Sequence, residues 1–305
     1  MRRLLLVTLV VVVAVLALPP LWFSLFPIDR PDLPPAGRRI AVGQGLTVNA
    51  LDRGSGPPVV MVHGLPGCAY DWTPLVDALA ARGRRAIAYG RIGYGRSDGR
   101  TNGDFTPAAN ALELVGLLES EDLRDATVVG WSYGGPVAIE AAVLSPERVG
   151  RVVLVGSGGP SNDEDEPPSV GPVFRLIMGW VGAVPPVGQA IQRSATDAAF
   201  SDGPVPDWWP AQLSANFGQP NTRPTYVEEI AGIAQAGEFV VERVTQPILL
   251  IHGDDDRLAP LAIGEWIDRH AKRSELVVVE GGSHMLPITH TDMMADRIAA
   301  FADQS

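Results

Sequence analysis

A short motif near the middle of the chain restricts its possible folds more than any other feature. Residues 130–134 read Gly-Trp-Ser-Tyr-Gly, with Ser132 at the centre. The apolar run Ala126–Val129 precedes the motif, and residues 136–142, which are mostly small and apolar, follow it in the manner of a helix. The two glycines allow a strand and a helix to approach closely around a strained serine. The motif therefore predicts a serine held at the tip of a strand, which suits nucleophilic acyl transfer.

The composition limits the classes of partner and cofactor. The chain has 305 residues, of which 46% are hydrophobic, and this is enough for one large core. Its formal net charge of −11 argues against nucleic acid as a partner, because phosphate binding needs a basic surface. Cys68 is the single cysteine, so the chain can form no internal disulfide. The five histidines lack the spacing of metal ligands, so the sequence implies no metal and no other cofactor.

The first 26 residues form a separate hydrophobic segment. Arg2 and Arg3 precede an apolar run, which is interrupted by two prolines and then resumes as far as Phe26. The stretch 4–26 is long enough to cross a bilayer, which needs about 20 apolar residues. The two arginines would keep the N-terminus inside, so the bulk of the chain would lie outside the cytoplasm.

We therefore expect a signal anchor at 1–26, a proline-rich linker at 27–37 and one domain at 38–305, tethered to the membrane outside the cytoplasm. Two alternatives remain open. A signal peptide cleaved after Ala17 would leave a secreted or periplasmic protein, and a buried helix of the domain would leave no anchor at all.

Beyond residue 38, short apolar runs alternate with helical stretches. We predict strands at 40–42, 47–52, 58–62, 85–89, 127–129, 152–155, 248–251 and 276–279, and helices at 72–81, 107–118, 261–270 and 291–301. Apolar strands that alternate with helices favour an α/β fold with a mostly parallel sheet covered on both faces. The stretch at about 157–242 has no clear strand and is too long for a loop, so we expect a helical cap inserted over the strand tips.

Five segments make the domain resemble the α/β-hydrolase superfamily, in particular its branch of capped serine esterases, epoxide-hydrolase-like and C–C-hydrolase-like proteins. They are His-Gly-Leu-Pro-Gly at 63–67, Gly-Tyr-Gly-Arg-Ser-Asp at 93–98, the motif at 130–134, His-Gly-Asp-Asp-Asp at 252–256 and Gly-Gly-Ser-His at 281–284. The resemblance covers about 38–303 and implies an eight-stranded sheet with the cap after the sixth strand. Epoxide hydrolases and dehalogenases of this fold carry a carboxylate where this chain has Ser132, so the hydroxyl disfavours both of those chemistries.

A serine nucleophile needs a base, and His284 is the best-placed histidine. It follows a predicted strand and two glycines, so its ring can reach across to Ser132. The resemblance supports this choice, because the family places its histidine in this loop. His290, which opens the last predicted helix, is the alternative.

The imidazole in turn needs a carboxylate that fixes its tautomer and stabilises its charged form. Three aspartates at 254–256 follow the strand 248–251, and the residues alone do not separate them. The family pattern Gly-x-x-Asp selects Asp256, which comes three residues after Gly253.

The resemblance also assigns the oxyanion hole to the backbone amides of Leu65 and Tyr133. Trp131, Trp208 and Trp209 are candidates for an apolar substrate pocket, although the cap core could hold them equally well. One segment departs from the family pattern. The glycine-rich loop usually begins Asp-Arg, and Gly90 replaces that aspartate here, which leaves the geometry of the loop in question.

These features predict a serine hydrolase that acts on a small apolar carboxylic ester through an acyl-enzyme, with Ser132, His284 and Asp256 as its catalytic triad. A C–C-bond hydrolase, an amidase or iminopeptidase, and a cofactor-free perhydrolase could use the same triad. A membrane-tethered binding protein on the same fold is the alternative without catalysis.

Overall fold

The chain folds around one eight-stranded sheet. The computed structural model describes residues 31–99, 103–160, 185–233 and 239–304. The strand order is β1-β2-β4-β3-β5-β6-β7-β8, with β1 and β2 antiparallel to their neighbours and the other pairs parallel. The strands are β1 Arg38–Ala41, β2 Thr47–Arg53, β3 Pro58–Val62, β4 Arg85–Tyr89, β5 Ala126–Trp131, β6 Val149–Val155, β7 Ile248–Gly253 and β8 Ser274–Val279.

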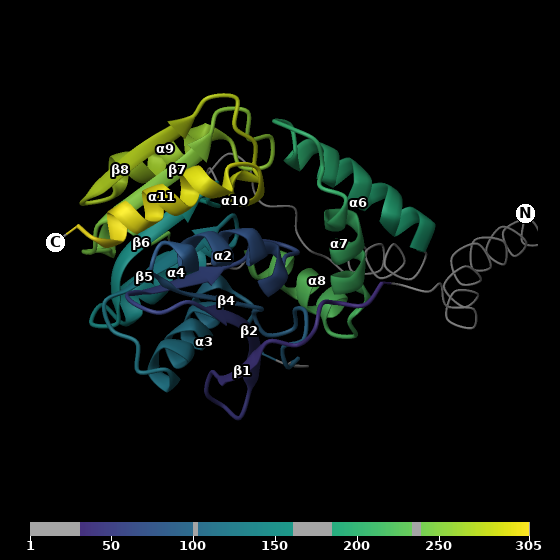
Figure 1. Cartoon of the computed structure of the whole chain (residues 1–305), viewed down its shortest axis with the longest axis horizontal. Coiled ribbons are helices and arrows are strands. Elements are labelled where there is room, and N and C mark those ends of the chain that lie inside the picture. Colours follow the sequence, from purple (N-terminus) through teal and green to yellow (C-terminus); the bar gives the residue numbers. More distant parts are fainter. Residues whose placement is uncertain (1–30, 100–102, 161–184, 234–238, 305) are drawn as a thin grey trace, which may run out of the picture.

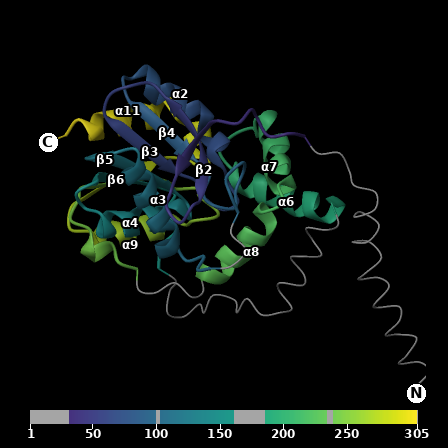
Figure 2. The same ribbon diagram turned by 90° about the horizontal axis from the view of Figure 1, so that it is seen from below.

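Helices cover both faces of this sheet. In Figure 2, α2 and α11 lie on one side of the strands and α3, α4 and α9 on the other. The helices of the sheet domain are α2 Thr73–Ala81, α3 Pro107–Ser120, α4 Gly134–Leu144, α9 Leu261–His270, α10 Leu286–Thr289 and α11 Thr291–Ala302, with short 3₁₀ turns η1 Ala69–Trp72 and η2 Val241–Arg243.

The apolar strands explain the two helix layers. Side chains alternate along a strand, so Val60 and Val62 of β3 pack with α3 and α4, while Val59 and Met61 pack with α2 and α11. Both sets are buried, and this is why β3 reads as a continuous apolar run rather than an alternating one. The expected α/β fold with a mostly parallel sheet is confirmed.

Three further helices lie between β6 and β7 in the sequence. They are α6 Pro185–Ala199, α7 Trp208–Gly218 and α8 Thr222–Ile233. Figure 1 shows them together on one side of the sheet domain, and we call them the cap. They occupy part of the stretch that was expected to form a cap, and residues 161–184 of that stretch lie outside the described residues.

The expected anchor at 1–26 and residues 27–30 of the expected linker also lie outside the described residues, whereas residues 31–37 of the linker are described. Within the part of the chain that the structure describes, no helix has the length and hydropathy to cross a membrane. The membrane tether and the location outside the cytoplasm therefore stay predictions.

Candidate active site

Ser132 occupies a strained turn between β5 and α4. Its φ of 54° lies in the left-handed region, which non-glycine residues rarely adopt. The two glycines of the motif allow this turn, because a Cβ at Gly130 would lie 2.3 Å from the carbonyl oxygen of Gly134, and one at Gly134 would lie 2.2 Å from that of Val62. The hydroxyl is consequently held at the carboxyl edge of the sheet, where α4 begins.

Asp256 and His284 meet beside this turn. Asp256 Oδ2 lies 2.7 Å from Nδ1 of His284, and both side chains are almost fully buried. Asp256 Oδ1 accepts hydrogen bonds from the backbone amides of Leu258 at 2.9 Å and Ala259 at 2.8 Å. These bonds fix the carboxylate, so it can hold the imidazole with Nδ1 protonated and Nε2 turned away from Asp256.

The structure shows which of the three aspartates at 254–256 contacts His284. Asp254 accepts a hydrogen bond from the amide of Gly281 and so links the loop after β7 to the loop after β8. Asp255 is partly exposed and pairs with Arg257 at 3.0 Å. Asp256 is the one that contacts His284.

Three further histidines lie near this edge of the sheet, and one of them, His252, has its Nε2 3.7 Å from Oδ2 of Asp256. His63 Nε2 accepts a hydrogen bond from the amide of Arg91 at 3.0 Å, and burial together with the Arg91 charge lowers the pKa of His63. Nε2 of His252 lies 2.7 Å from the carbonyl oxygen of Ala259, and burial lowers the pKa of His252. His290 lies beside Asp202 at 3.5 Å. None of these contacts involves Ser132.

The loop with Leu65 passes close to Ser132. A Cβ at Gly64 would lie 2.8 Å from Cβ of Ser132, so only glycine allows this approach. Leu65 follows directly and lines the same pocket as Ser132. Tyr133 is the N-cap of α4, and its phenol oxygen donates to the carbonyl of Phe105 and accepts from Asn110 at 3.1 Å each. Leu65 thus lies in the pocket of Ser132 and Tyr133 follows the serine at the start of α4, and their role as oxyanion residues stays a prediction.

A small pocket of about 100 Å³ joins these groups beneath the cap. Its described lining is Gly64, Leu65, Pro66, Gly67, Asp71, Trp131, Ser132, Ala195, Thr196, Ala199, Trp209, Leu213, Leu258, His284 and Met285. The small volume leaves room for only a small group beside Ser132.

The three candidate pocket tryptophans have different positions. Trp131 and Trp209 line the pocket of Ser132, whereas Trp208 lines a separate cavity on the other side of α7. Trp131 also donates a hydrogen bond from Nε1 to the carbonyl oxygen of His284 at 2.9 Å. It therefore supports the histidine loop as well as forming the pocket wall.

Asp71 is a pocket residue that the sequence analysis did not identify. It is 3% exposed, accepts hydrogen bonds from the amide of Cys68 at 2.7 Å and from Gln212 of α7, and lines the pocket of Ser132. Burial raises the pKa of Asp71 to about 6. Its position eight residues after His63, in the buried run that follows the oxyanion loop, was the available signal.

The raised pKa of Asp71 predicts a pH-dependent stability difference. The folded protein binds this proton more tightly than the unfolded chain, so the free energy of unfolding should fall as pH rises from about 4 to about 6. Asp71→Asn removes this titration. Relative to the unaltered protein, the variant should gain up to about 3 kcal/mol between pH 4 and pH 7, at 1.36 kcal/mol per pKa unit.

Urea unfolding of both proteins at several pH values measures this difference. Asp207→Asn, which alters an exposed carboxyl of the cap, is the matched control. A difference between the Asp71→Asn and unaltered proteins that does not change with pH would contradict the buried, titrating carboxyl.

Gly90, which replaces the usual aspartate of the glycine-rich loop, lies against Ser97 of the same loop. A Cβ at Gly90 would lie 3.1 Å from Oγ of Ser97, and this hydroxyl donates to the Gly90 carbonyl at 2.6 Å. Arg91 is fully buried and forms an ion pair with Glu229 of α8. Tyr94 donates a hydrogen bond to the same carboxylate at 2.6 Å. The cap therefore supplies the carboxylate that neutralises Arg91.

Comparisons with known proteins agree with this fold. The family model described as the alpha/beta hydrolase fold matches residues 57–291. The chain is 29% identical to the 2-hydroxymuconate semialdehyde hydrolase of Pseudomonas sp. (strain CF600), with 88% of this chain and 94% of that protein covered. It is 31% identical to a non-heme chloroperoxidase of Streptomyces lividans, with 81% of this chain and 91% of that protein covered.

A solved structure gives the same result at the level of the fold. The esterase of Exiguobacterium antarcticum superposes with a TM-score of 0.75 at 19% identity, with 88% of this chain and all of that chain covered. The match of the family model, the sheet order and the strained serine turn lead to one assignment: the chain belongs to the α/β-hydrolase-fold family and is an enzyme.

Proposed function

We propose that this enzyme hydrolyses carboxylic esters through an acyl-enzyme formed on Ser132. The observation that carries the proposal is the contact between Asp256 and His284 at 2.7 Å, in the wall of the pocket that also contains Ser132. A strained serine, a histidine and a buried carboxylate are the groups that acyl transfer requires.

The reaction follows from the position of each group. Nδ1 of His284 faces Asp256, so Nε2 is the nitrogen that takes the proton from Ser132 as its oxygen attacks the ester carbonyl. The amides of Leu65 and Tyr133 stabilise the negative charge that develops on the carbonyl oxygen. His284 then gives its proton to the departing alcohol and afterwards activates the water that releases the acid.

The charge of the pocket favours an ester over the substrate of one relative. The 2-hydroxymuconate semialdehyde in that relative's name carries a carboxylate. Among the described pocket residues there is no arginine or lysine, and Asp71 adds a negative charge above about pH 6. A buried anion beside Asp71 would lack a partner, so a neutral ester fits the pocket better.

A substrate panel tests the proposal. We expect turnover of p-nitrophenyl acetate and propionate, and at least 100-fold lower kcat/KM for 2-hydroxymuconate semialdehyde, because about 3 kcal/mol is a modest cost for burying an unpaired charge. The Ser132→Ala variant provides the background rate. Cleavage of the semialdehyde without ester turnover would contradict the proposed ester hydrolysis and indicate a C–C-bond hydrolase.

A further inference from the structure

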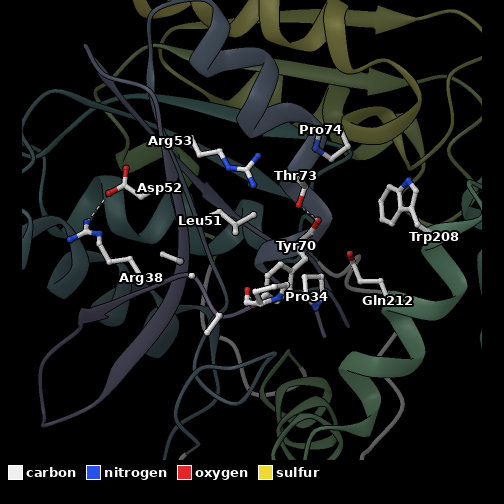
Figure 3. Close-up of a pocket in the computed structure, with 14 residues that line it drawn as sticks. Pro34, Arg38, Leu51, Asp52, Arg53, Tyr70, Thr73, Pro74, Trp208 and Gln212 are labelled. Carbon is white, nitrogen blue, oxygen red and sulfur yellow. Dashed lines mark hydrogen bonds and ion pairs between the residues drawn. The ribbon is translucent and has the colours of Figure 1, made fainter. Parts of the chain in front are cut away.

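A second cavity lies directly behind the wall of the Ser132 pocket. It has a volume of about 690 Å³ and is the larger of the two. Figure 3 shows Trp208 and Gln212 of α7 on one side of it, facing Tyr70 and Thr73. We call it the outer cavity and the pocket of Ser132 the inner cavity.

Neighbouring residues of the same two elements form the wall between the cavities. On α7, Trp208 and Gln212 line the outer cavity, whereas Trp209 and Leu213 line the inner one. On η1, Tyr70 lines the outer cavity and Asp71 the inner one. The wall is therefore about one residue thick, and it is formed by cap on one side and sheet domain on the other.

A single polar contact between described side chains closes this wall. Nε2 of Gln212, which lines the outer cavity, donates to Oδ1 of Asp71, which lines the inner cavity. Helix α7 does not depend on this bond for its position, because Asn216 donates to the carbonyls of Pro66 at 2.7 Å and Gly67 at 3.0 Å. The Gln212–Asp71 contact can therefore open while α7 stays attached.

The wall lies on the side of the inner cavity that receives the acyl group. His284 must protonate the departing alcohol, so the alcohol part of an ester lies toward His284. Asp71 is on the side of the oxyanion loop, since it bonds the amide of Cys68 and would contact a Cβ at Gly67 at 2.6 Å. An acyl chain that extends from the reacting carbonyl toward the oxyanion loop therefore reaches the Gln212–Asp71 contact.

The outer cavity suits an apolar, preferably aromatic, group. Its lining includes Pro34, Pro35, Tyr70, Pro74 and Trp208. Its charged side chains already have partners: Arg38 pairs with Asp52 at 2.8 Å, and Arg53 pairs with Asp77. A neutral arylalkyl chain would bury apolar surface there and leave no charge unpaired.

We propose that the outer cavity binds the distal part of long arylalkyl acyl chains and that the Gln212–Asp71 contact is the gate between the two cavities. This proposal rests on the ester-hydrolase function proposed above. With the gate closed, the inner cavity accepts acyl groups of about the size of acetyl or propionyl. With the gate open, the acyl chain of the substrate passes between η1 and α7 into the outer cavity.

A series of p-nitrophenyl esters tests the gate, with acetyl, butyryl, hexanoyl and 6-phenylhexanoyl as acyl groups. Gln212→Ala shortens the α7 side of the gate. The ratio of kcat/KM for the phenylhexanoate to that for the acetate should rise at least tenfold, since each buried methylene group contributes about fourfold. The acetate rate should stay within a few-fold of that of the unaltered enzyme.

A second variant tests whether the acyl chain enters the outer cavity, and a third serves as the control. Ala36 is exposed and lines the outer cavity, so Ala36→Trp should fill it. Added to Gln212→Ala, this change should abolish the gain for the phenylhexanoate without altering the acetate rate. Gln219→Ala, at the other end of α7, removes a glutamine that lines neither cavity and should leave the profile unchanged.

An unchanged chain-length profile in Gln212→Ala, or a gain that survives Ala36→Trp, would overturn the gate while leaving ester hydrolysis intact. If the unaltered enzyme hydrolysed no ester, the proposed function would fail. The gate would then be tested by covalent labelling of Ser132 with fluorophosphonates of different chain length. Gln212→Ala should then raise the labelling rate of Ser132 by a decyl fluorophosphonate relative to an ethyl one. An equal ratio in both proteins would contradict the gate.

Discussion

Replacing Ser132 with alanine should lower kcat for p-nitrophenyl acetate by about 10⁵-fold or more, as loss of the nucleophile does in comparable triads. The hydroxyl is the attacking atom of the proposed reaction, and no other hydroxyl of the described residues lines the inner cavity except that of Thr196 on the cap. The fold should survive, because alanine adopts the turn at φ 54° no less readily than serine does.

Steady-state kinetics of purified protein measure this loss. Ser120→Ala, which alters an exposed serine at the end of α3, should keep full activity and serves as the control. The double variant Ser132→Ala/His284→Ala should lose little more than either single variant, because the groups act as a unit. Turnover by Ser132→Ala within tenfold of the unaltered enzyme would exclude the serine mechanism.

Replacing Asp256 with asparagine should lower kcat by about 10⁴-fold with little change in structure. The amide oxygen can still accept hydrogen bonds from the amides of Leu258 and Ala259. The amide nitrogen would then face His284 and donate to Nδ1, so the proton would move to Nε2. An Nε2 that carries a proton cannot accept the proton of Ser132.

Asp254→Asn is the matched control for this effect. Asp254 accepts a hydrogen bond from Gly281 in the loop after β8, whereas Asp256 is the aspartate bonded to His284, so the loss of Asp254 should lower kcat less than tenfold. Circular dichroism and thermal unfolding of each variant separate misfolding from loss of chemistry. A collapse of activity in Asp254→Asn together with a functional Asp256→Asn would reverse the assignment of the acid.

The sheet was predictable because its strands are buried on both faces. The strand at 85–89 and the helix at 261–270 have the predicted bounds. Gly90 follows the strand and Pro260 precedes the helix, and both residue types mark the ends of regular elements. Other elements are longer than predicted, as with β6, which begins at Val149 rather than Val152. Polar residues such as Arg151 interrupt the apolar pattern there, although the parallel ladder continues past them.

Features that depend on how the cap lies against the sheet could not be predicted. Asp71 and Gln212 are 141 residues apart, and Arg91 and Glu229 are 138 apart. No local pattern connects such pairs, because each contact exists only after α7 and α8 dock. The same reason separates Trp208 from Trp209: adjacent residues of a helix point in different directions, and only the docked helix determines which of them lines which cavity.

Covalent labelling with a fluorophosphonate tests the central claim most directly, because it detects an activated serine without knowledge of the substrate. Intact mass should increase by one adduct, and peptide mapping should locate it on Ser132. The Ser132→Ala variant should take up none, and Asp256→Asn should react far more slowly than the unaltered protein. An adduct on another residue, or no adduct on a protein that hydrolyses esters, would contradict the serine mechanism.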